Sequence, residues 1–267
     1  MRYILAWFFC ISALFELSAQ QTQQNQPQNT TVSGSNLNAP ATENKLLIDT
    51  LNAARSHQEF RDLYFKQHEA DFVRLVKEGQ NPRTLFIGCS DSRVIPELIL
   101  FSRPGELFVI RTAGNFVPPY RFQNVDGVAA TIQYAVDVLN IRHIIVCGHT
   151  HCGAIEGLFK DLPPSLDVLQ NWLKLGEKAK RMTLLAAKPS TPKSELYNTA
   201  GEVSVIVQLE NLMTFPFVKK RVEEGKLELH GWYFDIESAA VSYYNTEQYR
   251  FLPLLKDQSS VHVSYVD

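Results

Sequence analysis

The sequence predicts an α/β fold, with a mostly parallel β-sheet flanked by helices and an N-terminal helical arm. The first observation is that short, continuously apolar segments alternate with longer segments of helical periodicity. Parallel strands buried on both faces between helices have this pattern. The second is that cysteine and histidine residues directly follow two of the apolar segments. Ligands of such sheets bind at the carboxyl ends of the strands, so the fold also indicates where a site would lie.

The N-terminal segment differs in composition from the rest of the 267-residue chain. Arg2 precedes a nearly all-apolar run at 3–15. Leu17, Ser18 and Ala19 then form a candidate cleavage site that ends in small residues. This pattern predicts a secretory signal peptide over residues 1–19. The apolar run is too short to favour a stable membrane span, although an uncleaved anchor stays an alternative. We therefore expect a periplasmic or secreted protein with no membrane span after cleavage.

Composition separates a linker from the folded part. Residues 20–42 are mostly Gln, Asn, Ser, Thr and Pro, which predicts a disordered linker. The remainder, 43–267, is expected to form a single domain. The formal net charge is −2 and there is no long basic run, so nucleic acid is excluded as a partner class.

The domain is expected to begin with a helical arm. Over residues 44–78, Phe60, Tyr64, His68 and Phe72 recur every four residues, which is the spacing of one helix face. A helix this far ahead of the first strand often packs on a neighbour. We therefore expect a homodimer or a higher oligomer.

Four apolar segments are predicted strands, at 84–89, 107–110, 143–147 and 227–234. Between the second and third, residues 124–139 carry one apolar stripe of helical spacing, and Asn124 can cap that helix. Further helical patterns lie at 155–159, 166–185 and 201–222.

The cysteines indicate a metal rather than disulfides. Without Cys10 of the signal peptide, Cys89, Cys147 and Cys152 remain, and an odd number of thiols does not build a disulfide framework. No C-x-x-C pair exists, which disfavours a thiol redox protein. Cys147 lies inside an apolar strand and is predicted to be a small buried hydrophobe. A metal would explain why an exported protein keeps the other two.

Two short motifs supply the candidate metal ligands. The sequence CSDSR begins with Cys89 at the end of the first strand, and HTHC runs from His149 to Cys152 after the third. Cys89, His149 and Cys152 are the predicted ligands of Zn2+, and three protein ligands leave a fourth position open, as in catalytic zinc sites. His151 is the alternative to His149, which we prefer because it comes straight off the strand.

With these motifs the sequence resembles the β-class carbonic anhydrases over residues 57–236. The segments that carry the resemblance are CSDSR, GHTHCG, PGELFVIR, GVAATIQYAV and LHGWYFDI. The resemblance implies a β-carbonic anhydrase-like fold, with zinc held by Cys89, His149 and Cys152. It also implies reversible hydration of CO2 to bicarbonate and a proton.

Asp91 and Arg93 are the predicted catalytic residues. Asp91 can accept a hydrogen bond from the zinc-activated nucleophile and orient it toward the carbon of CO2, while Arg93 keeps Asp91 ionised and fixes its rotamer. If Arg93 releases Asp91, the carboxylate can instead fill the fourth zinc position at low pH. Family members that close in this way often carry a Trp and a Tyr where this chain has Phe86 and Phe234. Although Arg111 matches the arginine of their bicarbonate site, we do not expect such a site here.

The other branch of the family lines its substrate groove with a Gln, a Phe and a Tyr, which match Gln80, Phe108 and Tyr134. Tyr134 lies half a turn from the apolar stripe of its helix, so core packing within that helix does not explain it. Phe108 has a plain core position as its alternative. Gln80 precedes the sheet and can reach the site of a partner subunit.

Two other functions remain alternatives to CO2 hydration. One is a hydrolase on the same scaffold that acts on carbonyl sulfide or carbon disulfide. The other is a zinc-binding protein without catalysis. Such a protein is expected to lack Asp91 or Arg93, and both are present here. His151 is a candidate proton shuttle, with a solvated surface residue as its alternative.

Overall fold

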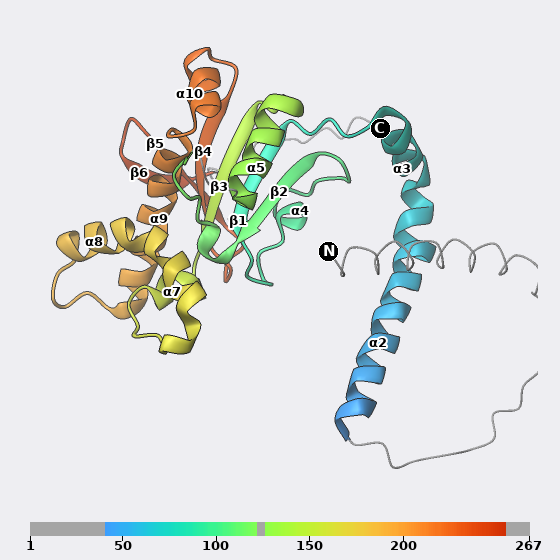
Figure 1. Ribbon diagram of the computed structural model, residues 1–267, viewed down its shortest axis with the longest axis horizontal. Helices are drawn as coiled ribbons and strands as arrows, with labels where there is room; N and C mark the ends of the chain where they lie inside the picture. The colour runs from blue at the N-terminus through green and yellow to red at the C-terminus, as the bar shows by residue number, and fades with distance from the viewer. Residues whose placement is uncertain (1–40, 122–125, 255–267) are drawn as a thin grey trace, which may run out of the picture. The chain divides into compact units, whose positions relative to one another are not determined.

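The computed structural model describes residues 41–121 and 126–254 (Figure 1). The predicted signal peptide, almost all of the predicted linker and the predicted cap Asn124 lie outside the described residues. The chain divides into two compact units, Met1–Tyr64 and Phe65–Asp267. No helix among the described residues is long and apolar enough to cross a membrane.

The predicted arm is helical throughout its length. It comprises α2 (Ala41–Glu59), a π-helical segment η1 (Phe60–Phe65) and α3 (Lys66–Glu78). The helix begins at Ala41, within the last two residues of the predicted linker, 20–42. Within α3 and the residue before it, the rings of Phe65 and Phe72 pack with centroids 5.1 Å apart.

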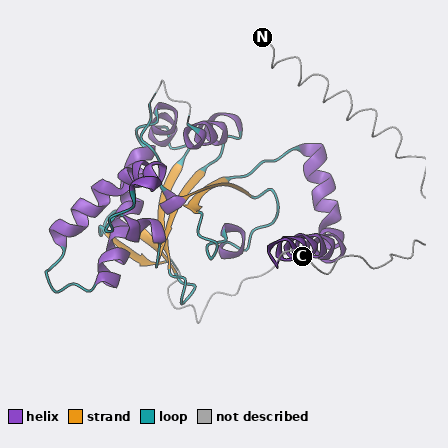
Figure 2. Ribbon diagram, turned by 60° about the horizontal axis from the view of Figure 1, so that its bottom comes forward, coloured by secondary structure: helices purple, strands orange, loops and turns teal. Residues whose placement is uncertain are grey.

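A single six-stranded sheet, in the order β2-β1-β3-β4-β5-β6, forms the centre of the second unit (Figures 1 and 2). The four predicted strands are present and parallel: β1 (Thr84–Cys89), β2 (Leu107–Thr112), β3 (His143–His149) and β4 (Glu228–Phe234). Two further strands, β5 (Val241–Asn245) and β6 (Arg250–Pro253), were not predicted, and they extend the sheet in antiparallel fashion. The sheet is therefore mixed, with its parallel part as predicted.

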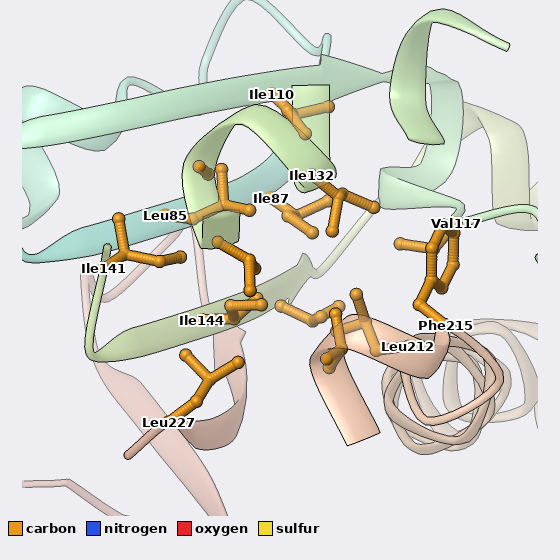
Figure 3. Packing of buried hydrophobic residues seen from close by; sticks show 14 of the residues in the cluster. Leu85, Ile87, Ile110, Val117, Ile132, Ile141, Ile144, Leu212, Phe215 and Leu227 are labelled. Carbon is orange, nitrogen blue, oxygen red and sulfur yellow. The ribbon is translucent and has the colours of Figure 1, made fainter. Parts of the chain in front are cut away.

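Both faces of the parallel strands are buried, which explains their continuous apolar sequence. On one face, side chains such as Leu85, Ile87 and Ile144 pack against residues of the helical segments, including Ile132 and Leu212 (Figure 3). On the other face, a second apolar cluster forms from Phe86, Val94, Ile145, Cys147 and Phe234.

The helices overlap the predicted ranges but differ from them in where they begin, end and are interrupted. The remaining helical segments are α4 (Pro96–Ile99), η2 (Ala113–Asn115), α5 (Gly127–Gln133), η3 (Tyr134–Val138), α6 (Gly153–Gly157), η4 (Pro164–Leu166), α7 (Asp167–Leu173), η5 (Lys174–Gly176), α8 (Glu177–Ala186), α9 (Lys193–Leu212) and α10 (Pro216–Glu223). The predicted helix at 166–185 is thus interrupted by η5. The predicted helix at 201–222 is divided between α9 and α10, and α10 begins at Pro216, a residue type that suits the first turn of a helix. Asp126, rather than Asn124, caps α5, because its side chain accepts a hydrogen bond from the backbone N–H of Val128 at 2.9 Å.

We predict that Ile132→Ala lowers the free energy of unfolding by about 2–5 kcal/mol, because it empties a fully buried position between α5 and the sheet. The matched control is Leu185→Ala on α8, where the side chain is 87% exposed and a loss within about 0.5 kcal/mol is expected. Urea unfolding followed by circular dichroism measures both. Equal losses in the two variants would contradict the assignment of this core.

Candidate metal centre

Three side chains of metal-ligand type meet at the carboxyl edge of the sheet. Cys89 is the last residue of β1, His149 is the last residue of β3, and Cys152 is the N-cap of α6. β1 and β3 are adjacent and parallel, so their ends lie together. The three candidate ligand atoms lie within 4.8 Å of one another, and the side chains are only 5%, 1% and 4% exposed. The structure therefore brings the three predicted ligands together.

The geometry of these donors fits a tetrahedral zinc ion. The sulfur atoms of Cys89 and Cys152 lie 3.9 Å apart, and two thiolates at about 2.3 Å from such an ion are roughly 3.8 Å apart. The Nδ1 atom of His149 lies 2.8 Å from the carbonyl oxygen of Thr150. Because a carbonyl only accepts, Nδ1 carries the proton and the lone pair of Nε2 is free. That Nε2 atom is buried and has no hydrogen-bond partner among the described residues, as expected of an atom that binds a metal.

The protein also prepares Cys89 as a thiolate. Its sulfur is paired with Cys152 and accepts hydrogen bonds from the backbone N–H groups of Asp91 and Gly114, both at 3.4 Å. These contacts hold the pKa of Cys89 well below its usual value. The neighbouring Cys89 and burial raise the pKa of Cys152 instead. A metal binds thiolates, so its binding would release any proton that Cys152 holds.

Two glycines allow this arrangement. Gly114 has a φ of 79°, and a Cβ there would lie 2.9 Å from the ring of Phe116. Its N–H can therefore reach the Cys89 sulfur only because it has no side chain. Gly148 precedes the histidine ligand, and a Cβ there would lie 2.8 Å from Val205, so the glycine lets α9 pack closely on β3 beside the site.

Asp91 and Arg93 form a two-pronged ion pair next to the ligands. Arg93 Nε donates to Asp91 Oδ1 at 2.9 Å, and Nη2 donates to Oδ2 at 2.7 Å. The backbone N–H of Arg93 also donates to Oδ1, at 3.0 Å. The hydrogen bonds from Arg93 hold the pKa of Asp91 far below its usual range. A carboxylate with this partner is ionised and fixed in orientation.

Arg111 is a site residue whose role the sequence did not reveal. Its guanidinium donates to three carbonyl oxygens of the loop after β1: Nε to that of Cys89 at 3.0 Å, and Nη2 to those of Asp91 at 2.6 Å and Val94 at 2.7 Å. One side chain thus fixes the backbone of the segment that carries both a ligand and Asp91. The signal that could have found it is its place near the end of β2, which we had matched only to a bicarbonate site.

The other two residues considered for the site have different roles. Cys147 is fully buried, and burial raises its pKa to about 12, so it is a structural thiol as predicted. His151 has a φ of 57° and does not belong to the ligand group. Its Nε2 atom lies 3.2 Å from a carboxylate oxygen of Glu237, and its carbonyl accepts from Arg93 Nη2 at 3.1 Å. His149 is therefore the histidine placed to bind a metal.

Gln80, Phe108 and Tyr134 lie away from the ligands of their own chain. The rings of Phe108 and Tyr134 pack 5.8 Å apart. Phe108 is paired with Leu85 in the sheet, four residues before Cys89 along β1, which corresponds to roughly 13 Å of strand. Gln80 is exposed and precedes β1. Tyr134 is 44% exposed, and Phe108 packs against the core, which was the alternative expected for it.

An apolar groove of about 890 Å³ opens beside the ligands. Its lining includes Ser90 and Ala113, which neighbour Cys89 and Gly114, together with Leu169 and Trp172 of α7. Trp172 Nε1 donates to the carbonyl of Ala113 at 2.8 Å, which ties α7 to the loop behind the site. Such a surface suits a small uncharged substrate.

The chain is thus an α/β protein with a buried Cys-His-Cys group at the carboxyl ends of its parallel strands. The family model described as "Carbonic anhydrase" matches residues 84–241. A carbonic anhydrase of Synechococcus elongatus is 42% identical over 186 residues, which cover 69% of this chain and 67% of that protein. One of Pseudomonas aeruginosa is 43% identical over 195 residues, 73% of this chain and 86% of the relative. The solved structure of the β-carbonic anhydrase CcaA superposes with a TM-score of 0.73 at 40% identity, over 77% of this chain and 99% of the other.

This chain belongs to the β-class carbonic anhydrase family, and it is a carbonic anhydrase. The family resemblance of the sequence and the predicted fold are both confirmed.

We predict that Cys152→Ala lowers the affinity for a divalent metal by at least about 100-fold. Removing a residue that only hydrogen-bonds to a metal ligand already costs about 10–100-fold in affinity, and removing a ligand itself should cost more. Cys147→Ala, on the neighbouring buried thiol, is the matched control and should keep the metal. Metal content per chain after dialysis against a weak chelator measures both. Retention of the metal by Cys152→Ala would contradict the site.

Proposed function

We propose that Cys89, His149 and Cys152 hold a zinc ion, at which the protein hydrates CO2 reversibly to bicarbonate and a proton. The observation that carries the proposal is the convergence of three buried ligands beside the Asp91–Arg93 ion pair, in a member of this family. When bound there, zinc supplies a nucleophile at neutral pH by acidifying water. Three protein ligands leave one coordination position for that purpose.

Asp91 orients the nucleophile in this proposal. Two hydrogen bonds from Arg93 occupy Oδ1, and one occupies Oδ2, so the carboxylate keeps a lone pair to accept a further hydrogen bond. Because Asp91 is ionised, it can only accept, and this aims the nucleophile's remaining lone pair at the carbon of CO2. Arg93 is itself anchored to the carbonyl of His151. Arg111 holds the backbone of the loop, so the carboxylate's position does not depend on its own rotamer alone.

The depressed pKa of Asp91 keeps this arrangement intact in mild acid. The usual pKa of an aspartate is about 3.9, and the folded-state pKa lies below it. The ion pair therefore stabilises the fold above that pH and is lost only as the pH falls further, through the folded-state pKa. Protonation of Asp91 does not break the pair between about pH 6 and about pH 9.

The decisive experiment is stopped-flow CO2 hydration by the purified protein, with zinc assayed on the same sample. Hydration with about one zinc ion per chain at the cysteine site is expected. Zinc at that site without hydration at any pH would overturn the proposal. Carbonyl sulfide and carbon disulfide, the linear sulfur analogues of CO2, would then be the next substrates to assay.

We predict that Arg93→Gln lowers kcat/KM for CO2 hydration by about 10–100-fold at neutral pH, because Asp91 loses its fixed orientation. The loss should deepen as the pH falls from about 9 to about 6.5, since the released carboxylate then competes better for the open zinc position. Arg103→Gln is the control, because this exposed arginine lies in the turn before β2 and outside the site. A pH profile parallel to that of the wild type would contradict the role given to Arg93.

We also propose that Gln80, Phe108 and Tyr134 complete the active site of a partner subunit. Their separation from Cys89 of their own chain supports this, as does the exposure of Tyr134. A structural neighbour from Sordaria macrospora, at 30% identity and a TM-score of 0.65, is described as tetrameric. A homodimer is the smallest assembly that satisfies the proposal.

A mixed dimer tests this arrangement. Asp91→Asn and Tyr134→Ala should each lower the activity of the homodimer, by about 10-fold or more. If the sites are shared, a dimer with one chain of each kind contains one intact site and one doubly defective site, so about half of wild-type activity returns. Two affinity tags, one on each chain, isolate this species. No recovery in the mixed dimer would place Tyr134 in the site of its own chain and contradict the proposal.

Finally, we propose that the protein is exported to the periplasm or secreted, after cleavage following Ala19. The charged start, the apolar run and the small residues Ser18 and Ala19 support this. N-terminal sequencing of the mature protein tests it, and a protein that still carries Met1 in the cytoplasm would contradict it.

A further inference from the structure

A second group of metal-ligand side chains lies at the amino ends of the parallel strands, at the other end of the sheet from Cys89 and His149. His143 is the first residue of β3 and Glu228 is the first residue of β4, with His230 two positions further on. The register pairs His143 with Glu228 and Ile145 with His230. Paired residues of parallel strands project to the same face, as do residues two apart. All three side chains therefore emerge from one face, beyond the apolar cluster that contains Ile145 and Cys147.

The three donor atoms are spaced as a metal requires. His143 Nδ1 lies 3.2 Å from His230 Nε2, and Glu228 Oε2 lies 3.7 Å from each of these nitrogens. Ligands at about 2.1 Å from a tetrahedral ion are roughly 3.4 Å apart. The triangle of donors thus approximates one face of a tetrahedron, and it leaves the fourth position to solvent.

Hydrogen bonding alone accounts for only part of this contact. A bond between the two imidazoles needs one N–H donor and one acceptor nitrogen, which the pair can supply at 3.2 Å. The carboxylate oxygen, at 3.7 Å from both nitrogens, is too distant to accept a hydrogen bond from either. A cation among the three would be attracted by the carboxylate and bound by both nitrogen lone pairs.

We propose that His143, Glu228 and His230 form a second metal site, separate from the Cys-His-Cys centre, for a divalent transition metal such as Zn2+. Two imidazoles and a carboxylate, without sulfur, suit this class of ion. Burial and the neighbouring His143 lower the pKa of His230, which favours the neutral ring that binds metals. An ion there would link the first residues of β3 and β4, and it has no part in CO2 hydration.

The surroundings predict that this site binds more weakly than the Cys-His-Cys centre. Its side chains are 40%, 69% and 34% exposed, whereas those of the other centre are buried. Arg142, Arg221 and Lys226 line the adjacent cavity of about 440 Å³. Lys226 is paired with Glu224 at 2.9 Å, and Arg221 donates to backbone carbonyls, so part of this positive charge is engaged. The ion at this edge should therefore be the first to leave on dialysis.

The test counts zinc ions bound per chain at equilibrium, across a range of free zinc up to about 1 mM. The full-length wild type should bind a second ion, whereas Glu228→Gln and His230→Ala should each bind only one. His57→Ala, a histidine outside both groups, is the matched control and should bind two. CO2 hydration should be the same in all four proteins. A single ion in the wild type, or two ions in both Glu228→Gln and His230→Ala, would overturn the proposal.

Cobalt separates the two sites spectroscopically. Co2+ at the cysteine site gives sulfur-to-metal charge-transfer absorption, whereas Co2+ bound by nitrogen and oxygen does not. The Cys152→Ala protein should bind one Co2+ ion without a strong charge-transfer band, and adding His230→Ala should abolish that binding. Persistence of this ion after His230→Ala would place it elsewhere and contradict the site. The result does not depend on CO2 hydration, so its failure is distinguishable from failure of the proposed function.

Discussion

The pairing of β1 with β3 is the constraint on which the rest of the site depends. Gly88 pairs with Cys147 in the register, so Cys89 and His149, the last residues of β1 and β3, lie at the same end of neighbouring strands. Apolar burial on both faces fixes this register, because a one-residue slip would turn core side chains such as Ile87 and Val146 to the wrong face. The candidate metal ligands are thus positioned by packing that takes no part in the chemistry. This explains how residues far apart in the chain form a site of defined geometry.

The loop after β1 needs a second constraint, because it lies beyond the ladder of the sheet. Arg111 supplies it from β2 through three carbonyl oxygens, and Arg93 then closes on Asp91 within the loop. An arginine suits this role because its planar fork offers several donors in fixed directions. The two arginines have different roles. Arg111 fixes the backbone of the loop, and Arg93 keeps the Asp91 carboxylate ionised and fixes its orientation. The position of the Asp91 carboxylate therefore depends on β2, on the loop after β1 and on His151, whose carbonyl anchors Arg93.

The sequence predicted those parts of the structure whose cause is local. β1 to β4 were predicted because burial on both faces leaves a continuous apolar run, whereas β5 and β6, at one end of the sheet, are at most half-buried and carry polar residues such as Ser242 and Arg250. The candidate ligands were predicted because Cys89 and His149 end two strands and Cys152 follows three residues after His149. The contacts of Arg111 and the meeting of His143 with Glu228 were not, since both depend on which strands are neighbours and in what register. Gln80, Phe108 and Tyr134 came only from family resemblance, and the sequence alone could not assign them to a subunit.

The groups at the site indicate why a bound metal should matter for folding. The sulfurs of Cys89 and Cys152 are buried close to His149 Nε2, which has no hydrogen-bond partner among the described residues. Burying an unpaired polar atom costs about 1–3 kcal/mol, and burying a charge costs more. A divalent cation would satisfy all three groups at once and balance two negative charges. Because the unfolded chain offers no such preformed group, the binding free energy adds to the free energy of unfolding. Thiolates engaged by a metal are also less available to oxidants, so a bound metal would protect Cys89 and Cys152 from oxidation.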